Sequence, residues 1–154
     1  MVRLSDLTDW DRRHILDADV TSFEGRPWAA AAAATERRVA IVTTAGLHRR
    51  GDRPFLPGAG DYRVIPGTST GDDLVMSHVS VNFDRTGFQE DLNAVFPIDR
   101  LRELACDRLI GSIADYHYSF MGGGTPPAWM RENAATVAAL LREDRVNAVL
   151  LVPV

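Results

Sequence analysis

Residues 89–125 read QEDLNAVFPIDRLRELACDRLIGSIADYHYSFMGGGT, and this segment decides the predicted fold. From Ile98 onward its apolar residues recur with the helical period, which predicts an amphipathic helix. Pro97 suits the first turn of that helix, because its missing N–H has no intrahelical partner there. Gly111 is expected to end it. The apolar stripe consists of Ile98, Leu101, Ala105 and Leu109.

Polar, hydrogen-bonding side chains follow this helix. His117, Tyr118 and Ser119 come first, and the glycine run 122–124 comes directly after them. Polar side chains beside a flexible backbone are typical of a small-molecule site, and they also occur in ordinary loops. The segment therefore marks a candidate site that the rest of the chain has to support.

The composition indicates a soluble globular protein. The 154 residues are 45% hydrophobic and 25% charged, which suits a single domain over 1–154 with a real core. The net charge of −4 and a pI near 5.5 argue against nucleic acid or a membrane surface as partner. The first residues lack the apolar core of a signal peptide, and the apolar runs are too short to span a bilayer. We therefore expect a cytoplasmic protein.

Two features of the composition restrict the chemistry. The 17 basic residues are all arginine, so no lysine Schiff base can form on this chain. Cys106 is the single cysteine, which excludes an intramolecular disulfide and a multi-cysteine metal site within one chain. Because Cys106 falls inside the predicted helix, we interpret it as a small helix residue rather than a nucleophile.

The strands and helices around this segment predict an α/β fold. Residues 39–44, VAIVTT, suit a strand buried on both faces, and residues 148–152, AVLLV, form a second run of the same type. An amphipathic helix over 128–144 precedes the second run. This β-α-β order predicts a mostly parallel, Rossmann-like sheet flanked by helices. The buried stripe of the second helix is Met130, Ala134, Val137, Leu140 and Leu141.

The remaining segments are assigned less regular structure. Residues 1–38 are expected to be helical or irregular, with Ser5 or Thr8 as a helix cap and a helix in the alanine run 29–34. Residues 49–72 form a long loop that contains a short strand at 62–66. Residues 74–83 alternate as a strand, with His78 on the face opposite to the apolar one. The apolar face of that strand consists of Val75, Val79, Val81 and Phe83.

The candidate pocket lies where ligands bind open α/β sheets, beyond the carboxyl ends of the strands. We predict His78 and His117 as catalytic, because either is suited to protonate a leaving amine. Asp91 or Glu90 is suited to pair with a substrate ammonium group. No dinucleotide fingerprint or phosphate loop is present, so no nucleotide cofactor is predicted. The substrate-binding candidates are Thr43, Thr44, His48, Asp91, Asn93, Tyr118, Ser119, Gly122 and Gly123.

Two other classes of function stay open. One is a non-catalytic binding protein or accessory subunit. The other is a metal-dependent hydrolase, in which His48, His78 and His117 would hold Zn²⁺, although no short ligand spacing supports it. The exposed end of the last strand also favours pairing with another chain, as a homo-oligomer or with a partner subunit.

Several segments together carry a resemblance to a known family. The chain resembles the selenoprotein B family of glycine, sarcosine and betaine reductases, together with the related D-proline reductase subunit. The similarity covers most of residues 39–154 and is most specific in the central segment. The matching segments are residues 39–47 (VAIVTTAGL), 73–78 (DLVMSH), 90–104 (EDLNAVFPIDRLREL), 110–111 (IG), 117–122 (HYSFMG) and 147–151 (NAVLL).

The resemblance implies an α/β fold and reductive cleavage of a C–N bond in a small amino acid or betaine. In that family a selenocysteine or cysteine follows the last strand, usually with a second cysteine a few residues on. It attacks a carbon that is activated elsewhere, in well-known systems through a pyruvoyl group on a partner subunit. This is covalent catalysis by a chalcogenate of low pKa.

The family's redox motif is absent from these 154 residues. One explanation is that a UGA codon was read as stop, so that selenocysteine follows Val154. The others are a short paralogue that keeps the binding half, and a nucleophile supplied by a separately encoded partner. We favour the first, and therefore expect no cofactor in this chain and a selenocysteine if the reading frame continues.

Overall fold

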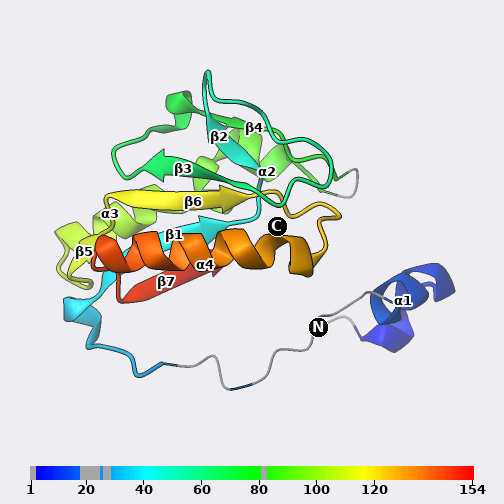
Figure 1. The fold of residues 1–154 in the computed structure, drawn as a ribbon, viewed down its shortest axis with the longest axis horizontal. Coiled ribbons are helices and arrows are strands. Elements are labelled where there is room, and N and C mark those ends of the chain that lie inside the picture. Colours follow the sequence, from blue (N-terminus) through cyan, green and yellow to red (C-terminus); the bar gives the residue numbers. More distant parts are fainter. Residues whose placement is uncertain (1–2, 18–24, 26–28, 81–82) are drawn as a thin grey trace.

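A computed structural model describes residues 3–17, 25, 29–80 and 83–154 of the chain (Figure 1). The main sheet contains β1 (Arg38–Thr43), β3 (Tyr62–Pro66), β5 (Ser112–Ile113), β6 (Tyr116–Phe120) and β7 (Ala148–Val152). A second, two-stranded sheet pairs β2 (Leu47–Arg49) with β4 (Leu74–Met76). The helices are α1 (Asp9–Leu16), α2 (Thr86–Glu90), α3 (Ile98–Cys106) and α4 (Pro127–Glu143). Short 3₁₀ turns occupy Leu4–Asp6, Ala34–Glu36, Gly71–Asp73 and Leu92–Ala94.

Strand β1 is the centre of the main sheet. It pairs in parallel with β5 and β6 along one edge and with β7 along the other. Ala40 and Ile41 have no exposed surface. The prediction of a strand that is buried on both faces is therefore confirmed for this segment.

The Rossmann-like arrangement is not confirmed, because the sheet is mixed. Strand β3 runs antiparallel to β6, with Tyr62 opposite Phe120, and β2 runs antiparallel to β4. A parallel neighbour needs a crossover that returns the chain to the other edge of the sheet, and this is usually a helix. No helix is present in residues 44–61, so the chain enters β3 from the edge where β1 ended. It therefore runs in the opposite direction.

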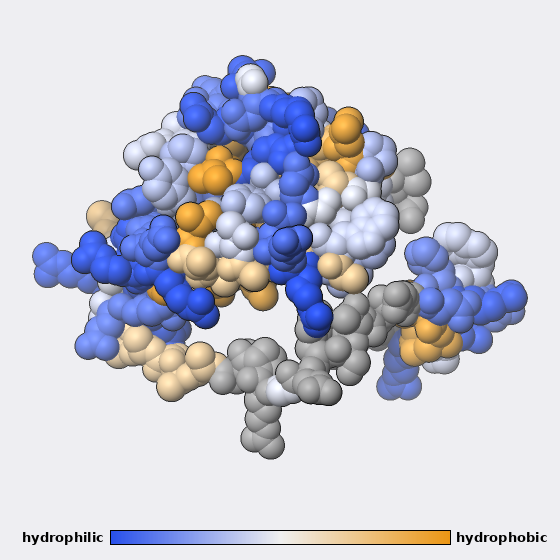
Figure 2. Space-filling view, viewed as in Figure 1, coloured by the Kyte–Doolittle hydropathy of each residue, from blue (hydrophilic) through white to orange (hydrophobic). Residues whose placement is uncertain are grey.

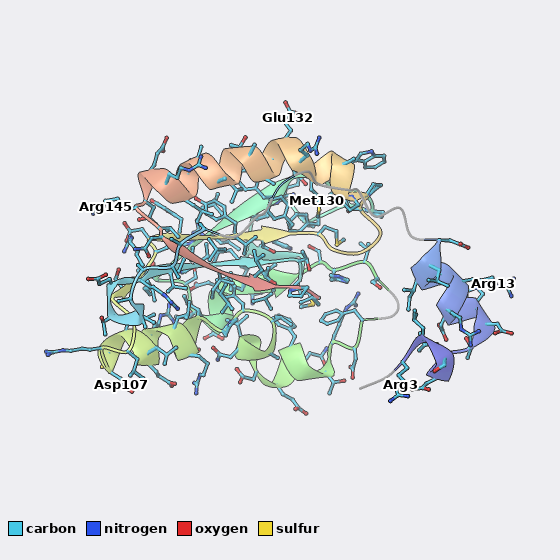
Figure 3. The ribbon with its side chains drawn as sticks, turned by 90° about the horizontal axis from the view of Figure 1, so that it is seen from below. Arg3, Arg13, Asp107, Met130, Glu132 and Arg145 are labelled. Atoms are coloured by element: carbon cyan, nitrogen blue, oxygen red, sulfur yellow. The ribbon has the colours of Figure 1, made fainter. Side chains whose placement is uncertain are left out.

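Helices cover the two faces of the main sheet (Figure 3). Helix α3 and the turn before it pack Val95, Phe96 and Leu101 against one face, together with Ile41 of β1. Helix α4 packs Val137 and Leu141 against the other face. Helix α1 lies to one side of the sheet and has no buried residues (Figure 1). Thr8 caps α1 as predicted, because its Oγ1 accepts a hydrogen bond from the Asp11 N–H at 3.2 Å.

Both predicted amphipathic helices are present, with corrections to their buried stripes. Helix α3 ends at Cys106 rather than near Gly111, and Leu109 is exposed. Arg108 adopts a left-handed φ of 58°, which ends the helix before Leu109 can continue the stripe. In α4, Ala134 is exposed, although it was predicted to be buried. Strand β7 forms as predicted, but its central residues are exposed because it lies at the edge of the sheet.

Two further predictions are wrong. The strand predicted over 74–83 is limited to Leu74–Met76, because its partner β2 begins only at Leu47. Gly46 has a φ of +64° and donates its N–H to the Phe120 carbonyl oxygen, so the ladder between the two strands does not continue. Position 81 of that prediction lies outside the described residues. Ala29–Ala33 are not helical, since an exposed alanine run gains nothing from tertiary packing, and short helices depend on it. In the described part of the chain, no helix is long and apolar enough to cross a membrane.

An ion pair holds the amino-terminal edge of the sheet together. The Arg38 guanidinium donates to the Asp144 carboxylate and lies 3.1 Å from that of Asp115. Asp144 also accepts the Asp115 N–H at 2.7 Å. Burial alone would raise the pKa of Asp144, but the bonds from Arg38 and the main chain outweigh it and hold this pKa below its usual value. The pair joins the start of β1, the β5–β6 connection and the end of α4.

We expect Asp144→Ala to lower the free energy of unfolding by roughly 2–3 kcal/mol, because a largely buried guanidinium loses the better buried of its two carboxylate partners and keeps only the exposed Asp115. Glu132→Ala removes an exposed carboxylate from the same helix and is expected to change stability by less than about 0.5 kcal/mol. Urea denaturation of the two variants and the wild type measures both effects. Equal urea midpoints for Asp144→Ala and Glu132→Ala would show that the Arg38–Asp144 ion pair contributes nothing to stability.

Candidate functional site

The carboxyl ends of three parallel strands meet at one edge of the main sheet. Strand β1 ends before Thr44, β6 before Gly122 and β7 before Val154. The Gly122 N–H donates to the Thr44 carbonyl oxygen at 2.9 Å, and the Val154 N–H donates to Thr44 Oγ1 at 2.8 Å. Thr44 Oγ1 in turn donates to the main-chain oxygen of Val154 at 3.3 Å. We call this group of three residues the carboxyl-edge cluster.

His78 lies against this cluster. A Cβ placed on Gly123 would lie 3.4 Å from His78 Cε1 and 3.1 Å from the Ser80 nitrogen. The backbone at Gly46 has φ +64°, and a Cβ there would approach the His78 nitrogen to 3.0 Å. Glycine at both positions therefore lets the imidazole and its main chain pack against the ends of β1 and β6.

The ring of His78 is buried, and only one of its two nitrogens has a hydrogen-bond partner among the described residues. Its side chain Nδ1 accepts the Ser80 N–H at 3.2 Å, so the proton of the neutral ring is on Nε2. Nε2 is buried and has no hydrogen-bond partner among the described residues. Burial, and next Arg85, lower the pKa of His78, whereas the main-chain oxygen of Val154 opposes this shift without forming a hydrogen bond of normal geometry. A buried imidazole with one unused donor is suited to binding or proton transfer.

An open hollow of about 490 Å³ lies next to His78. The Arg85 guanidinium borders it and donates through Nη2 to the His78 carbonyl oxygen. Its other donors remain available for a carboxylate in the hollow. No sequence pattern pointed to Arg85, and the alternation predicted for residues 74–83 put Ser80 on the same face as His78 without assigning it a role. The hollow is lined by Ser80, Phe83, Asp84, Arg85, Thr86 and Gln89.

His117 does not reach this edge. It lies within β6 without exposed surface, and its Nδ1 accepts the Ile41 N–H at 2.9 Å. Its ring meets Phe96 edge-on, with the centroids 5.6 Å apart. Burial, with Arg102 as the next cause, lowers the pKa of His117 to about 4, so the ring is neutral at pH 7. His117 Nε2, like that of His78, is buried without a hydrogen-bond partner among the described residues. The bond to Ile41 and the position within β6 favour a structural role, and the proton-donor role predicted for His117 stays untested.

Other predicted site residues have their hydrogen bonds satisfied within the core. Thr43 Oγ1 donates to the Val95 carbonyl oxygen at 2.9 Å. Ser119 Oγ accepts the Leu47 N–H at 2.8 Å, and Tyr118 packs with α4. His48 is buried in β2, where its Nδ1 lies 2.9 Å from the Arg49 carbonyl oxygen. The structure places these residues around the sheet and not in the carboxyl-edge cluster.

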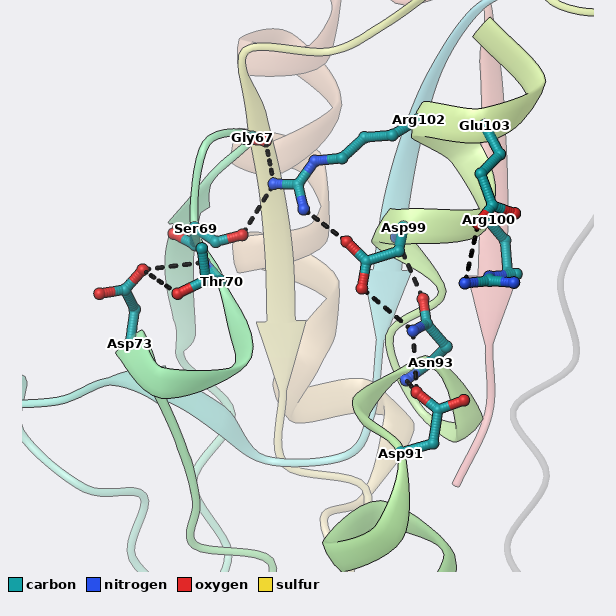
Figure 4. A network of polar contacts seen from close by, with 10 residues as sticks. All are labelled: Gly67, Ser69, Thr70, Asp73, Asp91, Asn93, Asp99, Arg100, Arg102 and Glu103. Atoms are coloured by element: carbon teal, nitrogen blue, oxygen red, sulfur yellow. Dashed lines mark hydrogen bonds and ion pairs between the residues drawn. The ribbon is translucent and has the colours of Figure 1, made fainter. Parts of the chain in front are cut away.

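Asp91 and Asn93 belong to a different network, at the start of α3 (Figure 4). The Asp91 carboxylate accepts both the main-chain and the side-chain N–H of Asn93, at 2.9 and 2.8 Å. Asn93 bonds to Asp99, whose carboxylate pairs with Arg102 at 2.6 Å. These contacts fix the entry to the helix. Their predicted role in binding a substrate ammonium group stays a prediction.

The histidines do not form a metal site with each other in the described residues. His117 is in β6, His48 is in β2 and His78 follows β4. Within residues 3–17, 29–80 and 83–154, no group of three His, Cys, Asp or Glu side chains converges. The structure therefore gives no support to the metal-dependent hydrolase.

Comparison with known proteins identifies relatives of the chain. Residues 26–154 match the family model described as glycine/sarcosine/betaine reductase selenoprotein B. The chain is 39% identical over 115 residues to D-proline reductase subunit gamma of Acetoanaerobium sticklandii, which covers 73% of this chain and 47% of that protein. No solved structure matches.

More distant relatives are named for other substrates. Glycine reductase complex component B subunit gamma of Symbiobacterium thermophilum is 29% identical, over 76% of this chain and 28% of that protein. Sarcosine reductase complex component B subunit beta of Peptoclostridium acidaminophilum is 32% identical, over 74% of this chain and 27% of that protein. The chain thus spans about half of the first relative and about a quarter of the other two.

Gly122→Ala tests the packing of the carboxyl-edge cluster. The new Cβ would lie 2.9 Å from both Thr44 Cβ and the Val154 oxygen, so the ends of β1 and β7 must move away from the end of β6. We expect a loss of about 1–3 kcal/mol in the free energy of unfolding. Gly71→Ala is the control, because nothing lies within 4 Å of its Cβ. Denaturant titration that gave both variants the wild-type stability would contradict the close packing.

His117 is expected to make stability depend on pH. The unfolded chain takes up this proton near pH 6.5 and the folded chain only near pH 4, so acid favours unfolding between these values. Across this window His117 accounts for a loss on the order of 3 kcal/mol. The His117→Asn variant keeps an acceptor for the Ile41 N–H but does not titrate. Its unfolding free energy should depend less steeply on pH than that of the wild type, and parallel curves would refute this.

Proposed function

Because the chain belongs to the glycine/sarcosine/betaine reductase selenoprotein B family, we propose that it takes part in reductive cleavage of a C–N bond in a small amino acid or betaine. The observation that carries this proposal is the family match over residues 26–154. The convergence of the strand ends on Thr44, Gly122 and Val154, beside a buried His78, supplies a place for it. Ligands of α/β proteins bind at this edge of the sheet.

The names of the relatives define the proposed substrate class. Glycine, sarcosine, betaine and D-proline all carry a carboxylate on the carbon whose bond to nitrogen would break, and they differ in the substituents on nitrogen. Arg85 is the proposed contact for the carboxylate, since its planar fork matches that group. Thr44, Gly122 and Gly123 would form the wall of the pocket.

The nucleophile is proposed to come from outside these 154 residues. Cys106 is exposed at the end of α3, and the Gly111 N–H a few residues later bonds to the Arg37 carbonyl oxygen, at the start of β1. Cys106, at the end of α3, therefore lies toward the edge of the sheet that is opposite to His78. A selenocysteine or cysteine that follows β7 in a longer reading frame, or on a partner, would instead arrive next to Thr44 and His78.

The proposed step moves two electron pairs and one proton. The chalcogenate forms a bond to the carbon, the C–N bond breaks, and nitrogen leaves with the bonding pair and takes up a proton. We assign His78 as the proton donor. Its lowered pKa makes the imidazolium form scarce at neutral pH but a stronger acid once formed. On this assignment the rate of C–N cleavage falls as the pH rises above the pKa of His78.

An accessory binding subunit is the second candidate. The observation that favours it is that Cys106 is the single cysteine of the sequence and lies away from the site. Such a subunit would bind the substrate without turnover by these residues. Isothermal titration with each of the four amino acids and betaines separates it from a protein that binds none of them.

The test uses the tagged protein isolated with its native assembly from its host. C–N cleavage is measured, with dithiothreitol as reductant, as release of ammonia or an amine from glycine, sarcosine and betaine and as ring opening of D-proline to an open-chain amino acid. His78→Asn keeps an acceptor for the Ser80 N–H and removes Nε2, so we expect kcat to fall about 10²–10³-fold. Cys106→Ser is the matched control and should retain wild-type kcat.

Three results would change the proposal. Wild-type kcat in His78→Asn would exclude His78 as the proton donor. Loss of activity in Cys106→Ser would place the redox chemistry on Cys106. No C–N cleavage in any of the four compounds, with binding retained, would replace the reductase by the accessory subunit.

A further inference from the structure

Strand β7 has the composition of an interior strand but lies at the edge of the sheet. Its residues Ala148–Val152 are all apolar. In the described part of the chain its one strand partner is β1. Proteins usually protect an edge strand with a charged residue, a proline or a covering element, because an unprotected edge pairs with other chains. No such residue interrupts β7 itself.

The unpaired edge of β7 presents regular main-chain donors. The Thr44 N–H donates to the Val152 carbonyl oxygen at 3.1 Å, so the even-numbered residues of β7 direct their main-chain groups toward β1. N–H and C=O groups alternate in direction along a strand. Those of Val149 and Leu151 therefore point away from β1, and they are available to another strand.

Apolar side chains continue this edge on both faces of the sheet. Val149 and Leu151 are 42% and 70% exposed, and Leu150, on the opposite face, is 38% exposed. Leu140 of α4 lines a pocket with Tyr116 and Tyr118 of β6. Because β7 lies on the side of β1 away from β6, the opposite flank of α4, with Ala134 and Ala138, is the one on the side of β7. Figure 2 shows apolar residues gathered along α4 and β7, among charged ones. A single added strand would cover the edge but leave part of these faces open.

The length of the relatives indicates what covers β7. The chain spans 47% of the D-proline reductase subunit and 28% of a glycine reductase subunit, so these proteins contain a further segment of at least comparable length. A strand from that segment, parallel to β7, would end beside Val154 and Thr44. The residues that follow it would enter the site at His78.

We propose that β7 pairs in parallel with a strand of the additional segment found in the longer relatives. The pairing joins that segment to the exposed edge and delivers its next loop to the carboxyl-edge cluster. This inference rests on the proposed function only for what the loop carries. A second copy of the chain is a different occupant, because two β7 strands related by a twofold axis would pair antiparallel.

Photocrosslinking from position 151 tests the occupant. p-Benzoylphenylalanine replaces Leu151 in the tagged protein expressed in its host, and the irradiated assembly is digested and analysed by mass spectrometry. Glu132 is the control position, because its side chain points away from the sheet (Figure 3). We expect an adduct from position 151, and none from position 132, with a peptide that is homologous to the additional segment. Denaturing electrophoresis before digestion tells whether that segment is joined to this chain or separate, because only an adduct between separate chains adds the mass of a second chain.

An adduct with a peptide of residues 1–154 from a second copy would overturn the proposal, and so would the absence of an adduct at position 151. A second variant tests the pairing itself. Leu151→Pro removes an outward N–H and blocks an incoming strand, while the hydrogen bonds to β1 use the even-numbered residues. Leu151→Ala shortens the same side chain and keeps the N–H.

With the photocrosslinker moved to position 149, Leu151→Pro should reduce the adduct at least tenfold, and Leu151→Ala should retain most of it. Circular dichroism confirms that both variants are folded. Equal adduct yields in the two variants would exclude strand pairing. C–N cleavage measured on the same samples, including ring opening of D-proline, keeps the two proposals apart. An adduct without C–N cleavage contradicts only the reductase, and C–N cleavage without an adduct contradicts only the strand pairing.

Discussion

The main-chain hydrogen bonding of β1 is the constraint on which the rest of the structure depends. Its even-numbered residues face β7, and its odd-numbered residues face β5 and β6. The ladder on the second side is interrupted between β5 and β6, and there the imidazole of His117 accepts the Ile41 N–H in place of a carbonyl group. A buried N–H left unsatisfied would cost about 1–3 kcal/mol, so this histidine completes the central strand.

Because β6 and β7 both run parallel to β1, the carboxyl ends of these three strands meet at one edge of the sheet. That edge then has to be closed by small residues and short contacts. Gly122 permits the approach of Thr44 and Val154, and Gly46 and Gly123 permit the approach of His78. The same parallel pairing places Arg38, Asp115 and Asp144 together at the opposite edge, where an ion pair stabilises the sheet. The ion pair that stabilises the sheet and the candidate functional site thus lie at opposite ends of the strands.

The sequence was sufficient for the elements whose apolar period is long or continuous: β1, β7, α3 and α4. It was insufficient where tertiary contacts decide. The alanine run 29–34 has helix propensity but no face to bury, and the strand from Leu74 ends where Gly46 turns away from it to bond with Phe120. Polar residues near one another in sequence also separated in space. His117 alternates into the core along β6, Asp91 and Asn93 cap the start of α3, and of the two histidines predicted as catalytic His78 reaches the strand ends.

Two unusual features at the carboxyl edge of the sheet, one in His78 and one in β7, have the same physical explanation. His78 is a buried imidazole with an unused donor, and β7 is an apolar strand with an unused edge. Unpaired polar groups and uncovered apolar strands both raise the free energy of a folded chain, and they lie next to each other at the end of β7. A single added strand parallel to β7 would pair the edge and bring its following loop to His78. The part of the protein that completes the sheet is then the same part that completes the active site.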